Sequence, residues 1–99
     1  KDEIRALEEM YAKAECPVIS NNSAHRTTPD VPMIIPEVNP EHMEIIFSQR
    51  KRLGTKKGFI AVKSNCSLQC YVPAIHPLLD FGVTNVLACT YHFWRRKNF

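Results

Sequence analysis

The 99-residue sequence predicts an α/β fold with a parallel sheet. A helical pattern over residues 1–15 leads directly into a short apolar run, Pro17 to Ser20, and then into polar turn residues. A second helical pattern, Glu41 to Arg52, ends at Gly54 and precedes another apolar run, Gly58 to Lys63. Helices that alternate with short apolar strands are typical of α/β domains whose strands run parallel.

The first helix is predicted from apolar residues that recur at steps of three and four, with acidic residues on the other faces. The apolar set is Ile4, Leu7, Met10, Tyr11 and Ala14. The strand that follows is expected to end at Ser20, because Asn21, Asn22 and Ser23 provide side chains that stabilise turns.

The middle of the chain is rich in proline. Four of the seven prolines lie in residues 27–40 around Met33 to Ile35, which predicts a stiff extended segment. Asn39 and Pro40 are typical of a helix start, and we expect Met43, Ile46 and Phe47 to share the apolar face of that helix.

Beyond the strand at residues 58–63, residues 64–67 form a turn into a helical run, Leu68 to Leu79. Pro73 and Pro77 predict a kink in this helix, because each removes a backbone hydrogen-bond donor. Residues 83–91 are rich in β-forming residues and predict a further strand.

Composition excludes several classes of protein. Hydrophobic residues make up 44% of the chain and charged residues 23%, which excludes wholesale disorder and a collagen-like repeat. No apolar run approaches the ~20 residues of a membrane-spanning helix, and a net charge of +3 is small for a nucleic-acid binder. We therefore expect a cytoplasmic chain that binds neither membrane nor nucleic acid. Because it begins with Lys1 rather than Met, we also expect a piece of a longer protein.

The four cysteines do not predict a disulfide framework or a metal site. Cys66 and Cys70 lie four residues apart, unlike the C-x-x-C pairs of zinc and redox sites, and no second pair completes a ligand set. Cys16 and Cys89 lie beside apolar runs, and we expect them to pack as small hydrophobic residues.

Cys66 lies where a predicted strand turns into a predicted helix. The free N–H groups and positive dipole of a helix start stabilise a thiolate, and the same N–H groups can hold an oxyanion after attack on a carbonyl. Asn65 can cap the helix or donate to a substrate. A structural cysteine beside capping residues explains the same pattern, and none of the four histidines has a spacing that ties it to Cys66 as a general base.

Basic residues occur at two places of interest. Arg26 follows the polar loop after the first strand, so its guanidinium is expected to point into the crevice where ligands bind in α/β folds. Arg50 to Arg52, with Lys56 and Lys57, could meet phosphates, but such a run more often forms a solvated helix end and loop.

Three segments resemble the aspartate-semialdehyde dehydrogenase family. They are Ser20 to Arg26 (SNNSAHR), Pro29 to Pro40 (PDVPMIIPEVNP) and Gly58 to Ser67 (GFIAVKSNCS), which matches the setting of that family's catalytic cysteine. The resemblance runs in order over residues 1–91, and the long segment between Arg26 and Cys66 is most similar to the archaeal and fungal-type branch.

The resemblance implies the end of a Rossmann-type NADP-binding domain, residues 1–63, joined to the start of an α+β catalytic and dimerisation domain, residues 64–99. It implies a homo-oligomeric enzyme that acts on small molecules. That enzyme interconverts aspartyl-4-phosphate and aspartate 4-semialdehyde with NADP and phosphate, in lysine, threonine and methionine biosynthesis.

The resemblance also implies roles for individual residues. Cys66 matches the cysteine that forms the acyl-thioester, and Arg26 and Asn65 match the residues that bind the phosphate group. Asn22 and Ser23 lie in the loop that borders the cofactor cleft.

The chain also departs from the family pattern. The glycine-rich phosphate loop, the acid/base histidine and the carboxylate-binding arginine have no counterpart here, so we expect no activity from the chain alone. From about residue 92 the sequence leaves the family's glycine-containing stretch, and we interpret this tail as a local reading-frame error. Two alternatives stay open: an inactive remnant of such a gene, and a small basic nucleic-acid-binding module. An N-acetyl-glutamyl-phosphate reductase is disfavoured, because that family has a Pro-Gly-Cys-Tyr turn around its cysteine.

Overall fold

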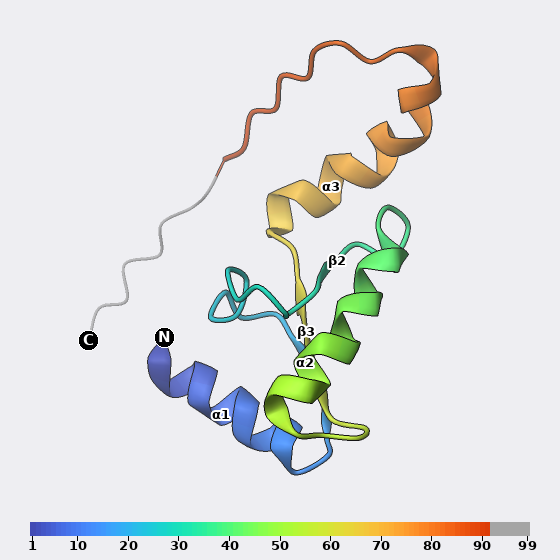
Figure 1. Cartoon of the computed structure of the whole chain (residues 1–99). Helices are drawn as coiled ribbons and strands as arrows, with labels where there is room; N and C mark the ends of the chain where they lie inside the picture. Colours follow the sequence, from blue (N-terminus) through green and yellow to red (C-terminus); the bar gives the residue numbers. More distant parts are fainter. Residues whose placement is uncertain (92–99) are drawn as a thin grey trace, which may run out of the picture.

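A three-stranded parallel sheet forms the centre of the molecule (Figure 1). The computed structural model describes residues 1–91 and contains β1 (Pro17–Ser20), β2 (Met33–Ile34) and β3 (Phe59–Lys63), in the order β1-β3-β2. Both outer strands pair in parallel with β3, and Ser20 lies opposite Val62. All three strands therefore end at one edge of the sheet, and the predicted α/β fold is confirmed.

The first helix, α1 (Asp2–Lys13), contacts β1 and β3 through a face that the apolar spacing did not predict. Ala12 is fully buried and Glu8 is 9% exposed, whereas Met10 and Tyr11 are more than half exposed. The small side chain of Ala12 allows close contact with the start of β3, where a Cβ added to Gly58 would lie 1.9 Å from the Ala12 carbonyl oxygen. Close approach, rather than apolar periodicity, selects this face.

The second predicted helix consists of a 3-10 segment, Pro40–Ile45, followed by α2 (Ile46–Leu53). It ends at Gly54, as predicted, with a left-handed φ of 71°. The buried positions are Ile46, Gln49 and Leu53, and the expectation that Phe47 lies on the buried face is wrong, because Phe47 is 67% exposed.

Gln49 is fully buried because its side chain continues the sheet where β2 does not reach. Its Oε1 accepts a hydrogen bond of 2.6 Å from the Ile60 N–H, and its Nε2 donates to the carbonyl oxygens of Ile60 (2.8 Å) and Asp30 (3.0 Å). An amide side chain presents one acceptor and two donors, so it can replace a strand neighbour for this part of β3.

The core lies between the two helices and one face of the sheet, since α1 and α2 contact each other as well as β3. Its buried cluster is Ala12, Val31, Leu53, Ile60 and Val62. Ile19 alternates to the opposite face of β1 and is 74% exposed. None of the helices in residues 1–91 combines the length and the hydropathy that crossing a membrane requires.

Beyond the sheet, α3 (Cys66–Ile75) contains Pro73 and continues into a 3-10 segment, His76–Phe81. This helix begins two residues before the predicted start. The predicted strand at residues 83–91 is wrong: Figure 1 shows this segment as an extended connection, and it pairs with no strand of the described chain. β-Forming side chains favour a strand only where neighbouring peptide groups are available.

The expected packing of Cys16 and Cys89 is also wrong, because both side chains are exposed. Cys16 lies in the short connection between α1 and β1, and Cys89 lies in the unpaired segment that follows the 3-10 segment His76–Phe81. The predicted aberrant tail, residues 92–99, lies outside the described residues.

Candidate functional site

The carboxyl edge of the sheet brings together the sequence-predicted site residues. The loop after β1 carries Asn22, Ser23 and Arg26, and the connection after β3 carries Asn65 and Cys66. Because β1 and β3 are adjacent parallel strands, these two connections leave the sheet side by side.

Asn65 is the N-cap of α3, which is one of the two roles expected for it. Its backbone is extended, with φ −55° and ψ 138°, and its Oδ1 accepts a 2.9 Å hydrogen bond from the Ser67 N–H. The Asn65 carbonyl oxygen accepts from the Leu68 N–H at 3.1 Å. The cap therefore uses two first-turn donors and fixes the direction in which α3 leaves β3.

Cys66 is the first residue of α3, and its side chain is exposed. Its Sγ lies 3.9 Å from Asn65 Oδ1, which makes only a weak S–H contact. Among the described residues, the N–H of Cys66 has no hydrogen-bond partner. An exposed thiol beside a helix-start N–H that is unpaired within residues 1–91 is an arrangement that could attack a carbonyl and hold the oxyanion that results.

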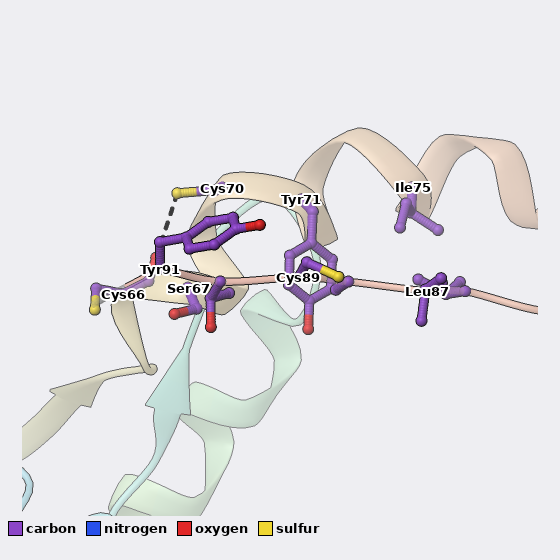
Figure 2. A pocket seen from close by; sticks show the side chains of 11 residues that line it. Cys66, Ser67, Cys70, Tyr71, Ile75, Leu87, Cys89 and Tyr91 are labelled. Atoms are coloured by element: carbon purple, nitrogen blue, oxygen red, sulfur yellow. Dashed lines mark hydrogen bonds between the residues drawn. The ribbon is translucent and has the colours of Figure 1, made fainter. Parts of the chain in front are cut away.

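A groove of about 610 Å³ lies between α3 and the extended segment that follows it (Figure 2). Cys66 and Cys70 lie at one end of it, and Tyr71 and Ile75 continue along α3. Cys70 Sγ lies 3.5 Å from the Cys66 carbonyl oxygen, and Figure 2 shows the sulfurs of Cys66 and Cys70 pointing in different directions. No histidine of residues 1–91 lines this groove.

Arg26 connects the two loops. Its Nε donates to the carbonyl oxygen of Lys63 at 3.1 Å, and its Nη2 lies 3.4 Å from the Asn21 carbonyl oxygen and 3.5 Å from that of Ser64. Its Nη1 makes no hydrogen bond within residues 1–91. The sequence predicted that this guanidinium points into the ligand crevice, and the structure adds that most of its donors already bind backbone.

The loop that carries Asn22 and Ser23 is held by local hydrogen bonds. The Asn22 N–H donates to Ser20 Oγ at 3.0 Å, and Asn22 Oδ1 accepts from the Ala24 N–H at 2.9 Å. Arg5 of α1 donates to the Ala24 carbonyl oxygen through Nε (3.2 Å) and Nη2 (2.7 Å). Ser23 is exposed at the outer side of this turn.

Two residues beneath this loop were missed by sequence reasoning. Buried Glu8 accepts a hydrogen bond from Ser20 Oγ, and its Oε2 is 3.9 Å from Nε2 of fully buried His25. His25 contacts the Arg5 carbonyl oxygen (3.2 Å) and Thr28 Oγ1 (3.1 Å) through its two ring nitrogens. The i, i+4 spacing of Glu8 and Ala12 was the available signal, because it marks the helix face that meets the sheet.

The basic run at residues 50–57 makes contacts within the chain. Arg52 pairs with Asp30 through two hydrogen bonds and with Glu9 at 3.3 Å, and the hydrogen bond to Asp30 is the main cause that raises the pKa of Arg52 above its ordinary value. Arg50 donates to the Lys57 carbonyl oxygen at 3.1 Å and lies over the Phe59 ring. Through these contacts, Arg50 links α2 to the turn and strand that follow it, and Arg52 links α2 to Asp30 and to Glu9 of α1.

The four cysteines are free thiols. Across residues 1–91, no group of three or more His, Cys, Asp or Glu side chains is placed to hold a metal ion.

Comparison with known proteins identifies relatives of this chain. Residues 1–46 match the family described as semialdehyde dehydrogenase, NAD binding domain. The chain is 44% identical over 85 residues to an aspartate-semialdehyde dehydrogenase of Archaeoglobus fulgidus, covering 86% of this chain and 24% of that protein. The resemblance to aspartate-semialdehyde dehydrogenase is confirmed.

The structural comparison points the same way. A crystal structure of aspartate-semialdehyde dehydrogenase with NADP from Candida albicans matches with a TM-score of 0.64 and 35% identity, over 80% of this chain and 23% of that one. A protein named malonyl CoA reductase (NADP) from Metallosphaera sedula is 42% identical over 85 residues, covering 85% of this chain and 24% of that protein. The chain thus spans about a quarter of the length of these archaeal and fungal relatives.

Proposed function

We propose that this chain is part of an aspartate-semialdehyde dehydrogenase that uses Cys66 as its nucleophile. The observation that carries the proposal is the placement of Cys66 at a capped helix start, with the Arg26 guanidinium bound to the two residues that precede the cap. The similarity to named dehydrogenases over most of the chain supports the same assignment.

In the proposed reaction, the Cys66 thiolate attacks the acyl carbon of aspartyl-4-phosphate. A C–S bond forms, the C–O bond to phosphate breaks, and inorganic phosphate leaves with its electron pair. The Cys66 N–H donates to the developing oxyanion. Arg26, through Nη1, and the Asn65 amide group bind the phosphate, since a guanidinium donates well to phosphate oxygens.

The residues present fit a role at the border of an NADP site. Exposed Ser23 and partly exposed Asn22 lie at the carboxyl end of β1, where ligands bind in open α/β sheets. When bound beside this loop, NADPH would supply the hydride that reduces the Cys66 thioester to the aldehyde as the C–S bond breaks and the thiolate leaves, and NADP would accept a hydride in the reverse direction. The chain's three glycines do not form a glycine-rich phosphate loop, so the dinucleotide phosphates need residues beyond this chain.

The wider assignment follows from the same similarity. We propose that residues 1–63 complete the NADP-binding domain and that residues 64–99 open the catalytic and dimerisation domain of a homo-oligomer. The enzyme acts in the cytoplasm, on small molecules of lysine, threonine and methionine biosynthesis. Its acid/base histidine comes from outside this chain, in keeping with the absence of a histidine from the lining of the groove in residues 1–91.

The test uses the full-length enzyme to which we propose that this chain belongs. NADPH formation is followed with aspartate semialdehyde, phosphate and NADP. Cys66→Ala is expected to abolish turnover and to leave NADP binding nearly unchanged. Cys70→Ala is the matched control, because Cys70 is also exposed and lies one turn along the same helix. Equal loss of activity in both variants, or activity in Cys66→Ala, would contradict the proposal.

The leaving group needs a separate test, because one relative is named as a malonyl CoA reductase. An acyl phosphate and an acyl-CoA thioester can both acylate a cysteine, and they differ in the group released. We expect acyl phosphate to be preferred because Nη1 of Arg26 makes no hydrogen bond within residues 1–91 and can donate to a phosphate oxygen. Faster NADPH oxidation with malonyl-CoA than with aspartyl phosphate would favour acyl-CoA thioesters as the substrate class.

A further inference from the structure

We propose that Arg26 positions the Cys66 nucleophile, in addition to binding phosphate. The inference rests on the proposed function, because it concerns the same cysteine. It assigns different nitrogen atoms of one guanidinium to two tasks: Nε and Nη2 hold the backbone that leads to Cys66, and Nη1 faces the ligand.

The backbone contacts lie immediately before the nucleophile. Nε donates to the carbonyl oxygen of Lys63, the last residue of β3, and Nη2 lies 3.5 Å from that of Ser64. Only Asn65 separates Ser64 from Cys66. A planar guanidinium that spans two successive carbonyl groups restrains the direction of the chain there.

The connection has few other polar restraints. Ser64 is 4% exposed, yet its buried Oγ has no hydrogen-bond partner within residues 1–91, so this side chain adds no polar restraint there. Asn65 and Cys66 are exposed, and the cap interactions of Asn65 lie within α3 itself. The Arg26 contacts are therefore the side-chain hydrogen bonds that tie this connection to the loop after β1.

The contact of Arg26 with Asn21 links the connection before Cys66 to the loop after β1. Nη2 is also 3.4 Å from the carbonyl oxygen of Asn21, the residue that follows β1. Arg26 therefore restrains the distance between the carboxyl ends of β1 and β3. A lysine in its place retains the charge, but its donors all lie on one nitrogen at the end of a flexible stem, so it cannot hold the three carbonyl groups with separate, coplanar nitrogens.

The two roles can be separated with an acyl donor that carries no phosphate. p-Nitrophenyl acetate is a neutral ester, and acylation of Cys66 releases p-nitrophenolate in a burst. The burst rate is measured across pH for the unmodified full-length enzyme, Arg26→Lys and Arg50→Lys. Arg50→Lys is the matched control, because Arg50 also donates to a carbonyl oxygen but lies near the α2–β3 turn.

We expect Arg26→Lys to lower the plateau burst rate at least tenfold, because small displacements of reacting groups have large effects on rate. The control is expected to keep the parent rate. The positioning role is overturned if Arg26→Lys keeps the parent's plateau burst rate. This holds even if the midpoint of its pH profile is shifted. Arg26→Gln provides a second variant with the same expected loss, and circular dichroism checks that each variant is folded.

Failure of the proposed function looks different. If Cys66→Ala gives the same burst as the unmodified enzyme, then Cys66 is not the nucleophile. A normal Cys66-dependent burst that Arg26→Lys leaves intact contradicts only the positioning role.

Discussion

Replacement of Gly58 by alanine is expected to force α1 away from β3. The added Cβ would lie 1.9 Å from the Ala12 carbonyl oxygen and 2.9 Å from its carbonyl carbon. Both are backbone atoms in the last turn of α1, so no side-chain rotation relieves the contact. The helix end must move, and this movement weakens the packing of Ala12 on Ile60, both of which are fully buried.

The expected cost has two parts. Overpacking of a close contact costs about 1–3 kcal/mol, and the rigidity of both backbones places this case near the upper value. Partial exposure of the apolar contact between α1 and β3 adds about 1 kcal/mol, at ~25 cal/mol per Å². We therefore expect Gly58→Ala to lower the free energy of unfolding by about 4 kcal/mol, a large share of the roughly 5–15 kcal/mol that stabilises a typical domain.

Gly54→Ala is the matched control. An added Cβ there meets no atom within 4 Å, but φ is 71°, so we expect only the left-handed penalty of about 1 kcal/mol. Urea unfolding of the full-length enzyme, followed by circular dichroism, measures both variants. A loss in Gly58→Ala that does not exceed the loss in Gly54→Ala would refute the close contact between α1 and β3.

Three further predictions concern single contacts and the isolated chain. Backbone hydrogen bonds from Lys57, Lys56 and Gly58, between 2.5 and 3.1 Å, lower the pKa of Glu15 from its ordinary 4.5, so its stabilising effect is present above about pH 4.5 and is lost as pH falls through the lower folded pKa. In urea unfolding of the full-length enzyme, Glu15→Gln is therefore expected to be less stable than the parent at pH 7, with the difference narrowing as pH falls below 4.5; a constant difference would contradict the role of the charge. Gln49→Leu leaves the buried N–H and carbonyl oxygen of Ile60 and the partly buried carbonyl oxygen of Asp30 without this partner and is expected to cost about 4 kcal/mol in the same assay, whereas Gln69→Leu, at a partly exposed position, changes little. The 99-residue chain alone exposes large apolar side chains such as Ile19 and Phe47, so we expect broad thermal unfolding and no NADP binding; a sharp transition from a monomer that binds NADP would overturn this expectation.

The sequence predicted those parts of the fold that depend on neighbouring residues in the chain. The strand Pro17–Ser20 has its predicted bounds, and Gly54 ends α2 because glycine tolerates the left-handed conformation. Partners distant in sequence decided the rest. Gln49 is buried because Ile60 needs a hydrogen-bonding neighbour, and residues 83–91 form no strand because no strand of the described chain pairs with them.

In the candidate site, too, some features depend on nearby residues and others on partners distant in sequence. The Asn65 cap follows from residue type beside a strand end, and the structure confirms it. That Arg26 binds the carbonyl groups of Lys63 and Ser64 depends on β1 and β3 being neighbours in the sheet, a pairing across about forty residues that no local pattern contains. The roles of Cys66 and Arg26 in catalysis stay predictions.

The central position of β3 has a consequence for motion. β3 has paired strands on both sides, whereas β1 and β2 each pair with β3 alone among the described strands. Amide hydrogens of β3 should therefore exchange with solvent more slowly than those of the loop after β1. Cys66 follows the strand that is expected to open most slowly, whereas residues 21–26 follow β1, so local opening can loosen the loop at residues 21–26 while α3 keeps its attachment to β3.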